Sequence, residues 1–517
     1  MASKGFFTKS FLLYHRILHR NLSIGKLYRR TLSAKLPRYP SQSTSPPSFD
    51  DISNKTLVID MDEWLLKSNS IFPYFMLVAL EGGGYLRGLL LLFSYLFLYF
   101  FASEELMLKV MVMFSFCGMK VDGFRLDRAV LPKYFLENVG LEGFEVLKKG
   151  LKEAKGVVCV SRRVPRVMVD GFLRDYMGVK EIMGREIGMK YGFFSGVLMD
   201  WNEDKLAQKM EDVGGDVMAF GSCFGKYSQQ LPFTEIYTTT EQEKKNWNTL
   251  PQDMYPNPLV FHDGRLAFTP TPMATLAMFV YLPLGIVLSV LRSLIFGLLP
   301  YRLSIPLSSL TGSRSYLVGQ PPQYKTGTNR AGGQLFVCNH RTLLDPIAIS
   351  AGLNRPVTAV TYSLSRLSEI ISPIQTARLT RNKEEDRRRM STLLARGDLV
   401  VCPEGTTCRE KFLLRFSPLF AELTDKVVPV ALNTRVDMFY GTSTSIFKFM
   451  DPFYFLMNPR PEYWVEFLEK VPTEGRSIDV ANGIQRKIGE ALGFELTVLT
   501  RKDKYMMLAG NEGIVKA

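Results

Sequence analysis

His340 and Asp345, with four residues between them, are the side chains of this chain best suited to acid–base chemistry. They follow a short apolar run, residues 335–337, that is typical of a strand. The Asp carboxylate can accept the imidazole N–H, fix its tautomer and stabilise the imidazolium, while the free ring nitrogen takes a proton from an alcohol. A structural His–Asp pair is the simpler interpretation. Because the chain holds only 4 His, one placed in this way stands out and predicts a general base.

A second motif, residues 397–407, reads as an apolar strand that runs into a Pro-Glu-Gly turn. Glycine permits backbone angles that other residues avoid, and proline ends strand pairing. The turn therefore presents Glu404 and several backbone N–H groups at the end of a strand. Because α/β folds bind ligands at that end, this motif strengthens the prediction of a functional site.

Four blocks in order resemble the glycerol-phosphate acyltransferase superfamily, and most closely the membrane-bound glycerol-3-phosphate acyltransferases of land plants. The blocks are residues 339–346, 373–381, 402–410 and 427–431. The resemblance implies acyl transfer from acyl-CoA to a hydroxyl of glycerol-3-phosphate, with release of lysophosphatidate. It implies neither a covalent enzyme intermediate nor a cofactor, since acyl-CoA is a substrate.

The same resemblance assigns roles to single residues. His340 would deprotonate the glycerol hydroxyl, and Asp345 would orient His340 and compensate its charge. The phosphate of the acceptor requires fixed cations, and the planar donor fork of Arg suits phosphate oxygens. Arg381 falls where the second block of the family carries its phosphate-binding Arg, and Arg378 is a second candidate. The residues that match the third block, which shapes the acceptor site in the family, are Glu404, Gly405 and Thr406.

The third block departs from the superfamily at one position. Many members carry Arg directly after Glu-Gly-Thr, but this chain has Thr407 there. The next cation is Arg409, which we expect to bind substrate in its place. The alternative for these Arg residues is a solvated charged face, which is the better interpretation of the run 387–389.

An N-terminal segment, residues 57–66, is an apolar strand that ends in Asp60-Met61-Asp62. It resembles the first motif of haloacid-dehalogenase-type phosphatases, which place Mg²⁺ between a nucleophilic Asp and a second Asp. The resemblance gives Ser161 the phosphate-binding hydroxyl of the second motif, and Lys190 the cation of the third.

The fourth phosphatase motif is degenerate. Its two acids are replaced by Ser222 and Lys226, and Trp64 replaces the usual Thr of the first motif. Because Mg²⁺ requires hard carboxylate oxygens, we expect this phosphatase-like domain to be catalytically inactive.

Composition limits the alternatives. The 517 residues carry a net charge of +14, with a pI of about 9.3, which suits an anionic membrane surface and phosphate-bearing ligands. Nucleic acid is the rival partner, but the sequence shows no zinc-finger spacing and no RNA-binding signature. The 6 Cys form no C-x-x-C pair, so we expect reduced thiols, a reducing compartment and no metal site.

Apolar segments predict contact with a membrane. We expect a re-entrant hairpin near residues 71–119 and kinked membrane helices over residues 266–300. Residues 1–50 form a basic arm rich in Ser and Pro, which suits either an organellar presequence or an arm on an anionic membrane. We therefore expect an integral, multi-pass membrane protein. Its expected compartment is the endoplasmic reticulum, and the mitochondrion is the alternative.

The alternation of short strands with helix-like segments predicts an α/β fold with a mostly parallel sheet. We expect a degenerate haloacid-dehalogenase-like domain joined by membrane-embedded helices to an acyltransferase-type α/β domain. The expected parts after the arm are residues 51–240, the linker 241–312, the acyltransferase domain 313–500 and a C-terminal tail, 501–517.

Two other functions remain open: an acyltransferase of the same superfamily with another acceptor, such as lysophosphatidate, and a non-catalytic membrane scaffold. The four ordered blocks argue against the scaffold. The sequence does not determine which acyl chain is preferred, which hydroxyl is acylated or what the oligomeric state is.

Overall fold

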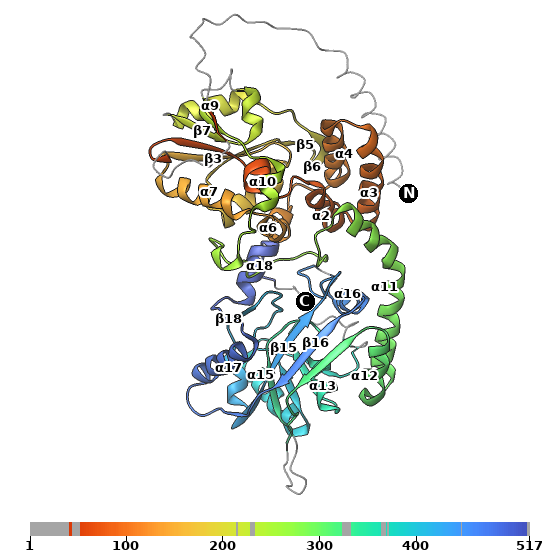
Figure 1. Ribbon diagram of the computed structural model, residues 1–517. Coiled ribbons are helices and arrows are strands. Elements are labelled where there is room, and N and C mark those ends of the chain that lie inside the picture. The colour runs from red at the N-terminus through yellow and green to blue at the C-terminus, as the bar shows by residue number, and fades with distance from the viewer. Residues whose placement is uncertain are drawn as a thin grey trace, which may run out of the picture. The chain divides into compact units, whose positions relative to one another are not determined.

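The structure is a computed structural model that describes residues 41–43, 52–213, 216–227, 233–322, 332–362, 369, 372–445 and 447–513. Residues Ser41–Ala517 form one compact unit. It contains an N-terminal and a C-terminal α/β domain, whose sheets share no strand (Figure 1). The predicted basic arm falls outside the described residues, apart from 41–43.

The N-terminal domain is built on a parallel sheet of order β1-β8-β7-β2-β3-β4, with a separate antiparallel hairpin, β5-β6. The central strands are continuous apolar runs because helices and loops cover both faces. The strands are β1 (Ser41–Ser43), β2 (Thr56–Asp60), β3 (Gly156–Ser161), β4 (Glu181–Gly184), β5 (Ile187–Lys190), β6 (Phe193–Leu198), β7 (Val217–Phe220) and β8 (Phe233–Tyr237). The helices are α2 (Phe72–Gly83), α3 (Tyr85–Phe101), α4 (Glu104–Phe116), α5 (Leu126–Ala129), α6 (Leu131–Leu136), α7 (Leu141–Glu153), α8 (Arg166–Gly171), α9 (Glu203–Val213) and α10 (Glu241–Asn246).

The predicted membrane hairpin near residues 71–119 is three helices with different surroundings. Helix α2 is buried in the core of the N-terminal domain, so the expectation that residues 71–80 face lipid is wrong. Helix α3 exposes a row of large apolar side chains, but its 17 residues are fewer than a perpendicular span requires. The exposed side chains of α3 include Leu86, Phe93, Phe97, Tyr99, Phe100 and Phe101.

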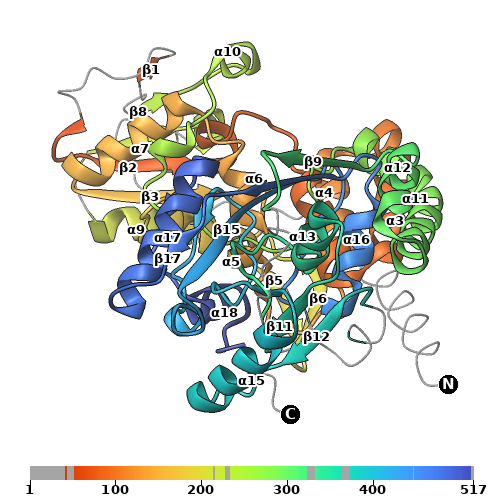
Figure 2. The same cartoon turned by 90° about the horizontal axis from the view of Figure 1, so that it is seen from below.

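Helix α11 (Pro272–Leu298) is the one helix in the described part of the chain that is long and apolar enough to cross a membrane. One stripe of α11 packs against α16 (Asp451–Met457). Arg292, fully buried on this stripe, donates to the carbonyl oxygens of Leu456 and Asn458, each at 2.6 Å. The rest of α11 exposes apolar side chains, as membrane contact requires. Helices α11, α12 and α3 gather on one side in both views (Figures 1 and 2).

The C-terminal domain has a sheet of order β12-β11-β13-β10-β15-β16-β9, with β17 paired to β15. The five strands from β12 to β15 are parallel, and β16 runs antiparallel to β15, which confirms the prediction of a mostly parallel sheet. The strands are β9 (Arg314–Val318), β10 (Leu335–Cys338), β11 (Thr358–Thr361), β12 (Gln375–Arg378), β13 (Leu399–Val401), β14 (Phe412–Leu413), β15 (Lys426–Arg435), β16 (Glu462–Phe467), β17 (Val471–Pro472) and β18 (Glu495–Leu496). The remaining helices are α12 (Tyr301–Leu310), α13 (Asp345–Leu353), α15 (Lys383–Arg396), α17 (Ser477–Leu492) and α18 (Arg501–Ala509).

Alternate residues of the central strands bury two different cores. Leu335 and Val337 of β10 pack with α15 and α17, while Phe336 and Cys338 pack with α13 and α16. Side chains of a strand alternate between the faces, so one short apolar run anchors helices on both.

The predicted C-terminal tail is partly helix. Helix α18 packs against α5 of the N-terminal domain, and its Leu508 is buried. The helix ends at Gly510, whose φ of +66° favours glycine. A Cβ there would lie 2.3 Å from the Arg125 guanidinium, which could move aside, so the positive φ rather than this contact explains glycine.

Candidate active site

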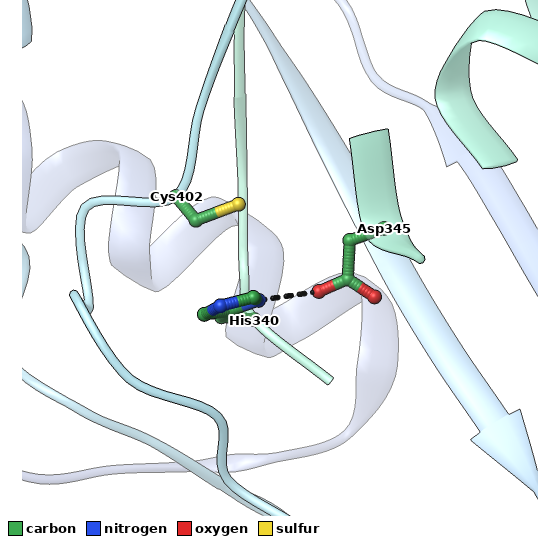
Figure 3. Close-up of side chains that lie close together, drawn as sticks. All are labelled: His340, Asp345 and Cys402. Atoms are coloured by element: carbon green, nitrogen blue, oxygen red, sulfur yellow. Dashed lines mark hydrogen bonds and ion pairs between the residues drawn. The ribbon is translucent and has the colours of Figure 1, made fainter. Parts of the chain in front are cut away.

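His340 and Asp345 meet at the carboxyl end of the central strand β10. His340 follows the strand after one residue, and Asp345 is the first residue of α13. His340 Nδ1 lies 2.7 Å from Asp345 Oδ2 (Figure 3). Because an ionised carboxylate only accepts, the proton lies on Nδ1 and the other ring nitrogen, Nε2, is the one that can accept a proton. The structure therefore forms the pair that the spacing predicts.

The Asp345 carboxylate is fully buried and surrounded by donors. Oδ2 also accepts from the backbone N–H of Arg341 at 2.7 Å, and Oδ1 accepts from the backbone N–H of Thr342 at 2.9 Å. The hydroxyl of Tyr463, from β16, also donates to Oδ1. These contacts fix the carboxylate in one orientation, and with it the imidazole.

Cys402 is the third member of this cluster. Its Sγ, a ring nitrogen of His340 and an oxygen of Asp345 all lie within 4.8 Å of one another (Figure 3). The Cys338 thiol, 3.4 Å away, and His340 lower the pKa of Cys402 to about 6, against the effect of burial. Burial lowers the pKa of His340, but Cys402 and Asp345 outweigh it, and the pKa lies well above its usual value. Two negative neighbours thus stabilise the imidazolium that forms when His340 takes a proton.

Glu404 connects the two sequence motifs. Its carboxylate accepts from the backbone N–H of His340 at 2.7 Å and from that of Leu414 at 3.0 Å. Burial raises the pKa of Glu404 to about 7. Gly405 ends the turn with φ +67°, which explains glycine at this position. Glu404 therefore holds the His340 loop in place, a role in addition to the predicted one in substrate binding.

His340 opens into a cavity of about 2180 Å³. One part of its wall is apolar and is formed by α11, α12, α13 and the sheet, with Phe296, Ile305, Leu317 and Ile347 among its residues. Another part is rich in Lys and Arg. The cavity is therefore suited to a ligand with one apolar and one anionic end.

The cavity wall brings together all the predicted site residues except Arg409 and the fully buried Asp345. Its wall includes His340, Arg378, Arg381, Glu404, Gly405 and Thr406. Arg378 forms an ion pair with Glu369 at 2.9 Å, whereas the Arg381 guanidinium forms no salt bridge with any described residue. These placements agree with the predicted roles without testing them.

Arg409 points away from the cavity. Its guanidinium is buried against the segment before α11, where it lies 3.3 Å from Asp263 and donates to the carbonyl of Gly264. It also donates to Thr442 Oγ1 at 2.8 Å and stacks over Tyr440. These contacts attach the third block to the linker, and they hold the Arg409 guanidinium off the cavity wall.

Sequence reasoning missed three groups that line the cavity or contact the pair. Cys402 is predicted only as one of the 6 reduced thiols, and Tyr463 lies in a strand with no motif. Lys504 lies in the supposed tail. Cys402 is the first residue of the third block, which offered a signal, whereas Tyr463 and Lys504 are brought in by tertiary folding alone.

The N-terminal domain gathers its Asp-x-Asp motif at the end of β2. Asp62 accepts from Ser161 Oγ at 3.0 Å, which joins the first two predicted motifs. Lys190 lies exposed on β5, so its assignment as the third-motif cation is wrong. Lys244 of α10 is buried instead, and burial lowers its pKa to about 8, although the acidic residues Glu63, Asp60 and Asp62 raise it.

At the position where this motif would bind Mg²⁺, the acidic side chains accept hydrogen bonds from other protein groups instead. Glu63 accepts from Ser222 Oγ at 2.6 Å and from the backbone N–H of Cys223 at 3.0 Å, while the Cys223 thiol lies 2.9 Å from Asp60 Oδ2. Asp60, Glu63 and Cys223 are close enough to share an ion, but each has a partner. The ring of Trp64 packs in the core against Phe220, so it does not crowd the phosphate side as its bulk suggests. The side chain of Lys226 lies outside the described residues.

Comparisons with known families match the N-terminal and C-terminal domains separately. A family model described as the HAD-like domain of RAM2-like glycerol-3-phosphate acyltransferases matches residues 56–240, and an acyltransferase model matches residues 323–433. Probable glycerol-3-phosphate acyltransferase 2 of Arabidopsis thaliana is 47% identical over 523 residues, which cover 96% of this chain and 97% of that protein. The chain belongs to the plant glycerol-3-phosphate acyltransferase family.

Other members of the family support the same conclusion. Glycerol-3-phosphate acyltransferase RAM2 of Petunia hybrida is 43% identical, over 88% of this chain and 97% of that protein. Among solved structures, the lysophosphatidate acyltransferase PlsC of Thermotoga maritima matches 42% of this chain and 92% of its own at 15% identity, with a TM-score of 0.24. A phosphoserine phosphatase matches 37% of this chain and 91% of its own at 14% identity, with a TM-score of 0.25. Full-length sequence similarity, rather than these low structural scores, establishes the family.

Proposed function

We propose that this plant glycerol-3-phosphate acyltransferase family member transfers a fatty acyl group from acyl-CoA to a hydroxyl of glycerol-3-phosphate and releases lysophosphatidate. The observation that carries the proposal is the His340–Asp345 pair beside a mainly apolar cavity whose wall also holds several Lys and Arg. Nε2 of His340 takes the hydroxyl proton as the oxygen attacks the thioester carbonyl. The C–O ester bond forms, the C–S bond breaks, and the imidazolium returns its proton to the leaving CoA thiolate.

The product keeps its phosphate in this proposal. A phosphoaspartyl reaction at Asp60 needs a divalent cation held by carboxylates. Here Ser222 and Cys223 donate to Glu63 and Asp60 where such a cation would bind. The N-terminal domain instead supports the acyltransferase site through the linker, since Glu81 of α2 accepts from the backbone of Arg265 and Asp263 pairs with Arg409.

The protein works at a membrane, with the endoplasmic reticulum as its compartment. The exposed apolar faces of α3 and α11 support membrane contact, and the apolar part of the cavity wall includes Phe296 of α11. A multi-pass arrangement remains part of the proposal. Glycosylation-site mapping on both sides of α11 counts its crossings: identical labelling of both flanks would contradict a spanning α11.

The central test is a product assay. The full-length chain, purified in detergent and returned to vesicles, is supplied with acyl-CoA and labelled glycerol-3-phosphate or, in a parallel arm, lysophosphatidate. We expect lysophosphatidate as the main product, and a loss of about 10²- to 10⁴-fold in His340→Ala, the usual contribution of general-base catalysis. Acylation of lysophosphatidate alone would favour the second acceptor, and no acylation of either would favour the scaffold.

The phosphatase part has its own control. Wild type and Asp60→Asn should release the same phosphate-bearing product with Mg²⁺ present. Monoacylglycerol formed by wild type and lost in Asp60→Asn would show that the phosphatase is active.

A further inference from the structure

The C-terminal helix α18 approaches the active site at the position where the third block departs from its family. Lys504 of α18 is buried, with 6% of its surface exposed. Its Nζ donates to the Thr407 carbonyl oxygen at 2.5 Å and lies 3.1 Å from Thr407 Oγ1. Thr407 stands where many superfamily members carry Arg. A cation from a distant part of the chain therefore reaches the site that lacks its usual one.

A second cation of α18, Arg501, is fixed at the cavity wall. Its guanidinium lies over the Tyr505 ring, 4.9 Å from the centroid, and donates to the Gly513 carbonyl. Lys448 lies 4.6 Å from the centroid of the same ring and donates to the Tyr505 hydroxyl. Tyr505 thus contacts both cations. Arg381 of the second block and Arg501 both line this cavity. Burial lowers the pKa of Arg501, and the charge of Arg381 lowers it further.

The cavity wall carries more cations than its ion pairs neutralise. Three other cations of the wall are ion-paired: Arg378 with Glu369, Lys383 with Glu422 and Lys502 with Glu512. Five cations of the wall form no salt bridge with any described residue, and they are Arg381, Arg415, Lys448, Arg501 and Lys504. Clustered cations repel one another unless an anion binds among them, and guanidinium groups suit a phosphate monoester in particular.

We propose that Arg501 of the C-terminal helix binds the phosphate of glycerol-3-phosphate together with Arg381, and so replaces the Arg that Thr407 displaces from the third block. The inference rests on the proposed function. Lys504 acts as a positioning residue that holds the Thr407 loop. CoA also carries a phosphate monoester, but the link from Lys504 to His340 favours the acceptor. Thr407 binds Lys504, and the next residue, Cys408, donates its N–H to the His340 carbonyl at 2.9 Å. A three-carbon acceptor must hold its phosphate near the base that deprotonates it.

The experiment compares Arg501→Gln and Arg501→Lys with wild type in the full-length chain. The matched control is Arg476→Gln, which removes an exposed Arg that pairs with Asp479 on α17 and does not line the cavity. KM is measured for glycerol-3-phosphate at saturating acyl-CoA, for acyl-CoA at saturating acceptor, and for an acyl donor that lacks the 3′-phosphate of CoA.

We expect Arg501→Gln to raise the KM for glycerol-3-phosphate about 10- to 100-fold, the usual effect of losing a charged hydrogen bond, with an unchanged KM for acyl-CoA. Arg501→Lys should lose less, because it keeps the charge. Arg476→Gln should behave as wild type.

Three results would overturn the assignment. Unchanged constants in Arg501→Gln would show that Arg501 binds no substrate. An increase confined to acyl-CoA, absent with the donor that lacks the 3′-phosphate, would assign Arg501 to CoA. Equal increases for both substrates would show a structural role. If the wild-type chain does not acylate glycerol-3-phosphate, the proposed function itself is wrong. The wild-type measurement shows this before any variant is compared.

Discussion

Replacing Asp345 by Asn tests the catalytic pair and its support at once. The carboxylate accepts from His340 Nδ1, from the backbone N–H groups of Arg341 and Thr342, and from the Tyr463 hydroxyl. An Asn side chain brings an NH₂ group that cannot accept. In the better orientation its oxygen keeps the contacts with His340 and Arg341, and the NH₂ group faces Thr342 and Tyr463.

The magnitude follows from these contacts. The Tyr463 hydroxyl can rotate to accept, but the Thr342 N–H loses its acceptor in a buried site. One such unsatisfied group costs about 1–3 kcal/mol of folding stability. The imidazolium also loses its buried counter-charge, so we expect a loss of activity of about 100-fold, at the lower end of the range for general-base catalysis because the tautomer is retained. His340→Ala, which removes the base, should lose more activity.

The assay pairs initial rates of acyl transfer with thermal unfolding of the same preparations. Asp479→Asn is the matched control, because Asp479 also lies in the first turn of a helix but is exposed. Asp479→Asn should change neither the initial rate of acyl transfer nor the unfolding temperature. An Asp345→Asn protein that unfolds at the wild-type temperature and keeps activity within about tenfold would refute the reasoning about both the carboxylate and the base.

Three further predictions address groups around the site. Arg409→Ala should lower folding stability by about 3–5 kcal/mol, because it leaves Asp263 with a buried, unpaired charge. It should leave the KM for glycerol-3-phosphate unchanged. A raised KM at wild-type stability would instead show that Arg409 binds substrate. Activity should fall as pH decreases through the raised pKa of His340, because the imidazolium cannot accept a proton. Cys402→Ser should move this acidic limb to lower pH by removing the thiolate that raises that pKa, and an unmoved limb in rate–pH profiles would contradict this. Arg292→Leu should detach α11 from α16, because the Leu456 and Asn458 carbonyls lose their donor, and faster proteolysis near α11 than in Ser293→Ala would report it.

The sequence alone predicted the His340–Asp345 pair and the class of fold, and the structure forms both. His340 and Asp345 lie on one continuous strand–loop–helix segment, so their meeting depends on local geometry that spacing encodes. Apolar runs separated by helical segments predicted the parallel sheet for a similar reason, since each run needs only to be buried on both faces. Ordered blocks then predicted the family that full-length similarity confirms.

Only the tertiary structure decided which cations face the cavity. The sequence predicts both Arg381 and Arg409 as substrate residues, but Arg409 pairs with Asp263 in the linker, whereas Arg381 lies at the cavity wall. Lys504 and Arg501 enter from a helix far along the chain that packs on the N-terminal domain. Burial of α2 likewise depends on the helices around it, because an apolar segment has the same sequence signature in a protein core as in lipid. Contacts between distant segments depend on how the whole chain packs, and no local pattern in the sequence records them.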